Sequence, residues 1–274
     1  MVRDFYPVEE SARVFSNLML ILSVSPLFAP TVGSFISTAF GWQAVFIFLA
    51  MIVALVFLTV WRLLPEGHAA DKTIVLDPRS IFQNLKSIFQ NSQFSTYAVA
   101  GGFSFAGLFG YLAGSSAIFM GTFQLGPRVF GGIFAFLSIG IIGGGQINIF
   151  ISRWFRAERV FKAALISQLC VALVFLVGSY FDILNLCAHI VLFFIYLSCV
   201  GLTYPNAAAL ALAPFQRNAG SAAALLGFLQ MTIGAIASAA FGFLNLRAGF
   251  SVSILFTLSS LFGFAILMYK RPSI

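Results

Sequence analysis

Three carboxamide side chains lie deep in long uncharged stretches of the chain: Gln146, Asn206 and Gln230. A carboxamide both donates and accepts hydrogen bonds, and it must find partners wherever water is excluded. Two interpretations follow from the residues alone. These side chains either hydrogen-bond between neighbouring helices or line a wet cavity that accepts a small-molecule substrate.

A second candidate set lies in another uncharged stretch. Tyr111, Ser115 and Phe119 follow one another at steps of four, which places them on one face of a helix. Together with the three carboxamides they form the predicted substrate-binding set.

Prolines mark two places where a helix could bend. Pro26, Pro30 and Gly33 lie at steps of four and three, and Pro205 precedes Asn206. A proline inside a helix removes a hydrogen bond and kinks it. The residues are therefore candidate hinge or gating positions, although neighbouring helices can also repair such a bend without any functional consequence.

The sequence lacks the groups that catalysis would need. It shows no nucleophile–base pair, no metal-ligand spacing and no phosphate-binding loop. Its three cysteines, Cys170, Cys187 and Cys199, lie within or beside apolar runs, where they are typical small core residues and not metal ligands. We therefore expect no enzyme and no metal site.

Composition places the chain in a membrane. Hydrophobic residues make up 60% of the 274 and charged residues only 8%, whereas water-soluble proteins carry about a quarter charged residues. The net charge of +7 would suit a nucleic-acid partner in a soluble protein. Here the basic residues lie in short connectors between apolar runs, where they set membrane topology, so we expect no nucleic acid.

The uncharged stretches give the number of membrane crossings, because a charge at mid-bilayer costs about 2.5–3.5 kcal/mol. One crossing takes about 20 helical residues. The first stretch is too long for one crossing and breaks at Gly41-Trp42 into helices 15–37 and 43–63. The next gives a helix near 96–122, and each of the others gives one more, so we expect about eight spanning helices. These other stretches are 129–152, 163–181, 183–216, 218–246 and 248–269.

The basic residues also predict the orientation. If the N-terminus is cytoplasmic, all of the 15 lysines and arginines except Arg128 and Arg247 fall on the cytoplasmic side. This asymmetry follows the positive-inside rule. Both termini are therefore expected in the cytoplasm.

One connector, residues 64–94, is longer than the others. Asp77 followed by Pro78 is typical of a helix start. The apolar residues that follow recur at helical spacing, which predicts a short amphipathic helix in the membrane interface. These residues are Ile81, Phe82, Leu85, Ile88 and Phe89. The connector leaves two spans before it and six after.

Several short motifs then carry a resemblance to a known family. In order they are Ala29-Pro30-Thr31-Val32-Gly33-Ser34, Gly41-Trp42-Gln43, Phe105-Ala106-Gly107-Leu108-Phe109, Gly201-Leu202 with Pro205-Asn206-Ala207, and Ala219-Gly220-Ser221-Ala222 with Leu226-Gly227-Phe228-Leu229-Gln230. At these spacings the chain resembles the Bcr/CflA (bicyclomycin-resistance) subfamily of drug:proton antiporters in the major facilitator superfamily. Arg3 and Asp4, and also Arg153, Arg156 and Arg159, are similar to its cytoplasmic loop motifs.

The resemblance implies an all-α integral membrane protein with the major facilitator superfamily fold, N-terminally truncated. Members have twelve spans in two bundles, so the spans here would be the last eight. Residues 1–63 would be the last two helices of the N-terminal bundle, 64–94 a cytoplasmic linker and 95–274 the C-terminal six-helix bundle. The first four helices, which carry the membrane-embedded charges expected to move protons, would be absent.

The implied function is export of small amphipathic drugs across the bacterial inner membrane by proton antiport. It needs no cofactor apart from the coupling proton. The expected partners are the lipid bilayer, the drug and the missing N-terminal helices as a separate chain. Because alternating access requires two bundles around one site, two alternatives stay open. One is a non-transporting remnant or partner-dependent fragment, and the other is a transporter of a metabolite such as a sugar or amino acid.

Overall fold

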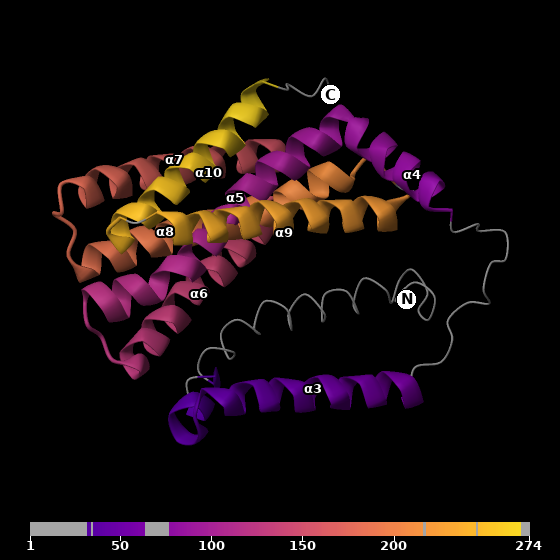
Figure 1. Ribbon diagram of the computed structural model, residues 1–274. Coiled ribbons are helices and arrows are strands. Elements are labelled where there is room, and N and C mark those ends of the chain that lie inside the picture. Colours follow the sequence, from indigo (N-terminus) through magenta and orange to yellow (C-terminus); the bar gives the residue numbers. More distant parts are fainter. Residues whose placement is uncertain (1–31, 34, 64–76, 216–217, 245, 270–274) are drawn as a thin grey trace. The chain divides into compact units, whose positions relative to one another are not determined.

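The computed structural model describes residues 32–33, 35–63, 77–215, 218–244 and 246–269 (Figure 1). Every regular element in these ranges is a helix. Residues 32–33 and 35–40 are helical. The elements that follow are α3 (Trp42–Leu63), α4 (Pro78–Gln90), α5 (Ser92–Ser116), the π-helix η1 (Ala117–Thr122), α6 (Pro127–Ile151), α7 (Ala157–Tyr180), α8 (Leu186–Leu212), α9 (Ala219–Phe243) and α10 (Ala248–Tyr269).

Seven of these segments are long and apolar enough to cross a membrane, with α5 and η1 counted as one. They coincide with seven of the predicted spans, and the all-α membrane fold is confirmed. The remaining predicted span, 15–37, lies almost entirely outside the described residues. The largest difference is at α7, which begins at Ala157 and not near residue 163.

The predicted turn at Gly41 is present. Gly41 has a φ of +86°, a left-handed conformation that glycine adopts without steric cost. Its amide donates to the Ser37 carbonyl at 3.1 Å, and α3 begins at the next residue. Glycine is therefore required where the chain leaves one helix and enters another.

The predicted amphipathic helix is also present, as α4. The Asp77 side chain accepts a hydrogen bond from the amide of Arg79 at 3.4 Å, and Pro78 is the first helical residue. Polar contacts connect α4 to the start of α9: Asn84 Nδ2 donates to Ser221 Oγ at 3.3 Å, and Asn218 Nδ2 donates to Asn84 Oδ1 at 3.2 Å.

The chain divides into two compact units. One comprises residues 1–76 with 127–135, and so contains α3 and the first turns of α6. The other comprises residues 77–126 and 136–274, and so contains the other helices and the rest of α6. The predicted division at residues 63 and 94 stays a prediction.

The second unit is built around α5, which packs against α8, α9 and α10, while α7 packs against α8 and α10 (Figure 1). One end of its core contains Phe94, Tyr97 and Phe161, together with residues of α8 and α9. Fully buried Phe193 and Phe256 lie farther along the bundle. In a bilayer, close van der Waals packing of such side chains helps to hold the helices of a bundle together.

Polar contacts identify which connections share an end of this unit. Arg247 Nη1 lies 2.7 Å from Asp182 Oδ2, which brings the α7–α8 and α9–α10 connections together. At the start of α5, Gln93 Nε2 donates to the Leu210 carbonyl near the end of α8, at 2.9 Å. This pairing agrees with the predicted alternation, in which both Asp182 and Arg247 lie on the far side of the membrane.

Candidate functional site

Two of the predicted site residues meet on one ring. Tyr111 of α5 and Phe119 of η1 both contact Phe193 of α8, with ring centroids 5.5 and 5.8 Å apart and the rings nearly perpendicular. Edge-to-face contacts of this kind stabilise aromatic clusters. Ser115, which lies between Tyr111 and Phe119 in the sequence, is also buried, and its hydroxyl donates to the Leu112 carbonyl at 3.4 Å. The cluster fixes the end of α5 against α8.

Phe119 is carried by an irregular segment that the sequence did not predict. Residues Ala117–Thr122 form a π-helix that continues α5, and the amide of Phe123 donates to the Ile118 carbonyl at 3.0 Å. π-Helical turns are rare and occur often at functional sites. The extra residue in this turn rotates the side chains that follow it relative to those of α5.

Asn206, on α8, finds its partner on α6. Its Nδ2 donates to Asn148 Oδ1 at 2.6 Å and to the Leu202 carbonyl at 2.7 Å. Gln146, the predicted substrate-binding residue on this helix, is instead exposed. Side chains two positions apart on an α-helix point in directions about 200° apart. Gln146 and Asn148 therefore cannot both face α8. The residue that the sequence analysis missed is therefore Asn148.

Glycines bring α6 and α8 close together beside this pair. A side chain at Gly144 would overlap the Ser198 carbonyl oxygen, and one at Gly201 would overlap the Ile141 carbonyl oxygen. Gly140, Gly144 and Asn148 lie at steps of four, so one stripe of α6 faces α8. That spacing is the signal that could have found Asn148 from the sequence.

Gln230 lies on α9 and is 3% exposed. Its Nε2 makes no hydrogen bond to any residue that the structure describes. A side chain on Gly102 of α5 would come within 3.8 Å of the Gln230 Cα and 2.7 Å of Ile233 Cδ1, so α5 and α9 approach closely here. An unpaired buried amide costs about 1–3 kcal/mol, which makes Gln230 a candidate for binding a polar group of a ligand.

A second polar network crosses the bundle and was not predicted as a site. Ser104 Oγ donates to Gln168 Oε1 at 2.7 Å, Gln168 Nε2 donates to the Ser104 carbonyl at 3.1 Å, and the hydroxyl oxygens of Ser104 and Thr203 are 2.6 Å apart. All three residues are at most 1% exposed. The network links α5, α7 and α8 with its described groups satisfied, so it is structural.

The remaining predicted residues fall in different places. Pro205 lies inside α8, where it removes the helical hydrogen bond to the Gly201 carbonyl. Gly33 is in a described helical stretch, whereas Pro26, Pro30, Arg3 and Asp4 lie outside the described residues. Arg153, Arg156 and Arg159 are exposed in the α6–α7 connection and on the first turn of α7.

The predicted set is therefore distributed over three places in the bundle. Tyr111 and Phe119 share the cluster at Phe193, Asn206 pairs with Asn148, and Gln230 lies between α5 and α9. A role of these residues in substrate binding stays a prediction. Within the described ranges, no group of three or more His, Cys, Asp or Glu side chains could hold a metal ion.

Comparison with known proteins identifies the family. Residues 1–239 match the family model of the Major Facilitator Superfamily. The chain is 28% identical over 240 residues to the uncharacterized MFS-type transporter YdgK of Bacillus subtilis (strain 168), covering 87% of this chain and 60% of that protein. It is 26% identical over 278 residues to the bicyclomycin resistance protein homolog of Haemophilus influenzae, covering 98% of this chain and 67% of that protein.

A further relative is multidrug resistance protein D of Escherichia coli (strain K12), 28% identical over 236 residues, with 83% of this chain and 56% of that protein covered. The chain thus spans between 56% and 67% of the length of these relatives. The names of the Haemophilus influenzae and Escherichia coli relatives confirm the predicted resemblance to drug-efflux proteins. All three relatives are named as transporters or resistance proteins, not as enzymes. The chain belongs to the Major Facilitator Superfamily.

Proposed function

We propose that this chain provides the C-terminal bundle of an exporter of small amphipathic drugs, driven by proton entry across the bacterial inner membrane. Relatives named for bicyclomycin and multidrug resistance support the choice of substrate class. The observation that carries the proposal is Gln230, a buried carboxamide whose Nε2 lacks a partner among the described residues.

The chemistry of the bundle favours an amphipathic substrate over a charged metabolite. In the described spanning helices, charged residues occur only near helix ends, such as Glu158, Arg159 and Lys162 in the first turns of α7. A sugar or amino acid would need fixed charges or a dense set of polar groups in the pocket. Amides such as those of Gln230 and Asn206, set among aromatic and aliphatic side chains, can orient an uncharged polar group instead.

Alternating access requires a second bundle around the same site. Among the spans of the second unit, α6 and α9 have the smallest fraction of buried residues. Each therefore has a face that the described helices of this unit do not cover. We assign those faces to a second bundle, whether it belongs to the same polypeptide or to another chain. That bundle would also carry the protonating group, because the described helices hold no carboxylate in their interior.

The proposed topology places both termini and the basic α6–α7 connection in the cytoplasm. It is supported by the distribution of lysine and arginine along the sequence. Cysteines introduced at Glu66 and Ala157 should both react with a membrane-impermeant reagent only after the cells are opened. Labelling of either one in intact cells contradicts the orientation.

Replacement of Gln230 by leucine tests the substrate site. In a transporter completed by a second bundle, Gln230→Leu should change which drugs are exported, while membrane insertion and protein level stay the same. The matched control is Gln83→Leu, which removes an exposed carboxamide on α4. An unchanged resistance profile in Gln230→Leu removes this residue from the site.

A further inference from the structure

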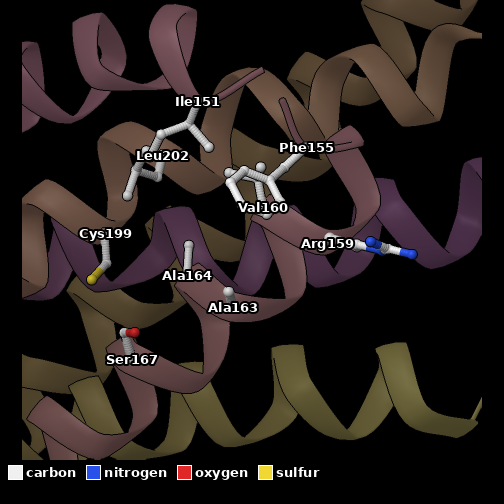
Figure 2. Close-up of a pocket in the computed structure, with 9 residues that line it drawn as sticks. All are labelled: Ile151, Phe155, Arg159, Val160, Ala163, Ala164, Ser167, Cys199 and Leu202. Carbon is white, nitrogen blue, oxygen red and sulfur yellow. The ribbon is translucent and has the colours of Figure 1, made fainter. Parts of the chain in front are cut away.

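The second unit contains a cavity of about 430 Å³. It lies between the end of α6, the first half of α7 and the middle of α8 (Figure 2). Its volume falls in the range of small-molecule sites, about 300–1,000 Å³. None of the six predicted substrate-binding residues lines it.

The cavity is apolar and opens at the side of the bundle. Its buried floor is formed by Val160, Ala164 and Cys199, which are at most 6% exposed. Ala163 and Ser167, which also line it, are exposed on the outer face of α7. In a membrane-spanning helix, an apolar hollow with exposed walls is filled by hydrocarbon.

A basic residue marks one end of the hollow. Arg159, Ala163 and Ser167 lie at steps of four along α7 and cover about 12 Å of helix. That length is close to one leaflet, half of a hydrocarbon core of about 30 Å. Figure 2 shows Arg159 at the end away from Ser167, with its guanidinium pointing away from the apolar lining residues.

The surroundings of Arg159 carry positive charge and interfacial aromatic residues. Arg153, Arg156 and Lys162 are exposed nearby in sequence, and Glu158 is the acidic residue among them. Trp154 is 74% exposed, as is typical of side chains at the headgroup level of a bilayer. A hollow for hydrocarbon thus begins at a cluster of cations in the interface.

We infer that this hollow binds an anionic phospholipid, with one acyl chain between α7 and α8 and the phosphate at Arg159. Basic pockets at the cytoplasmic ends of spanning helices have the charge that attracts anionic headgroups. The lipid would fill the hollow and hold the basic α6–α7 connection at the membrane surface. It is distinct from the proposed exported substrate.

Fluorescence of Trp154 can test this inference on the full chain. Trp42→Phe and Trp61→Phe leave Trp154 as the single tryptophan. The protein is reconstituted in phosphatidylcholine vesicles and titrated with brominated phosphatidylglycerol or brominated phosphatidylcholine. We expect half-maximal quenching at a mole fraction about fivefold lower for the anionic lipid. This is the difference in affinity that one cationic contact near the membrane surface provides. Equal titration curves overturn the inference.

Two variants distinguish binding of the lipid in the hollow from a general attraction of anionic lipids to the basic surface. Ala163→Phe fills the hollow without changing charge, and Arg159→Gln removes the cation at its end; both residues are exposed. Each should abolish the preference for the brominated anionic lipid. Lys86→Gln, which removes an exposed cation on α4, should keep it. Retention of the preference in Ala163→Phe or in Arg159→Gln shows surface attraction only and contradicts the proposed site.

Discussion

Asn206 donates a hydrogen bond of 2.6 Å from its Nδ2 to the Oδ1 of Asn148, which joins α8 to α6. The same Nδ2 also donates to the Leu202 carbonyl at 2.7 Å, and Asn206 is 3% exposed. In lipid, such polar side chains hold helices together because their alternative is an unsatisfied group in hydrocarbon. The pair lies beside Gly144 and Gly201, where α6 and α8 approach closely. Close packing and a hydrogen bond therefore hold the same two helices together.

Leucine at either asparagine should lower the free energy of unfolding by about 1 kcal/mol, since interhelical hydrogen bonds in membranes contribute about 0.6 kcal/mol and at most about 1.7. The measurement is a double-mutant cycle of Asn148→Leu and Asn206→Leu, followed by denaturant titration in mixed micelles. The double variant should lose less than the sum of the single variants. Strict additivity would show that the hydrogen bond contributes nothing.

Alanine at Gly144 should destabilise the bundle, because its methyl group would overlap the Ser198 carbonyl oxygen, which belongs to the backbone and cannot rotate away. We expect a loss of about 1–3 kcal/mol, measured as thermal unfolding in detergent. Gly143→Ala is the matched control, since a methyl group there meets nothing within 4 Å. Equal stability of the two variants contradicts the close approach of α6 and α8.

Leucine at Gln168 should destabilise the bundle by about 1–3 kcal/mol, because the buried Ser104 hydroxyl then loses the carboxamide oxygen that accepts its hydrogen bond and the Ser104 carbonyl loses the Gln168 donor. Cys170→Ala changes an exposed residue of the same helix and should leave the midpoint of unfolding unchanged. Loss of stability in both variants would point to a general sensitivity of α7, not to the polar network.

The ion pair between Asp182 and Arg247 should contribute little. Its side chains are 78% and 67% exposed, and exposed pairs typically contribute between 0 and 1 kcal/mol. Asp182 also has a φ of +58°, a conformation that asparagine tolerates as well as aspartate. Asp182→Asn should therefore change the free energy of unfolding by less than about 1 kcal/mol. A larger loss would show that this pair fixes the two connections in place.

The spans could be predicted from the sequence because a charged side chain is costly in hydrocarbon. The charged residues therefore mark the segments between spans. The start of α7 could not be placed in this way. Glu158, Arg159 and Lys162 all belong to that helix, since long charged side chains at a helix end can reach the interface while the backbone stays helical. A charge-free window therefore marks the hydrocarbon part of a helix and not its first turn.

Side-chain partners could be predicted less well than spans. Gln146 and Asn148 are both polar residues in an apolar run, and only the stripe from Gly140 through Gly144 indicates which one faces α8. The π-helix at Ala117–Thr122 has the same mixture of apolar residues and glycine as the α-helices around it, so its sequence does not distinguish it from an α-helix. The network of Ser104 and Gln168 depends on three helices meeting, which residue spacing along one helix does not specify.

The account rests on this chain acting as one bundle of a drug exporter. The direct measurement is drug efflux from energised cells that express the chain together with the part of multidrug resistance protein D that it does not match, compared with cells that express either part alone. We expect efflux only when both parts are present, with loss of efflux on addition of a protonophore. Absence of efflux with both parts well expressed in the membrane, or efflux that the protonophore does not affect, would contradict the account.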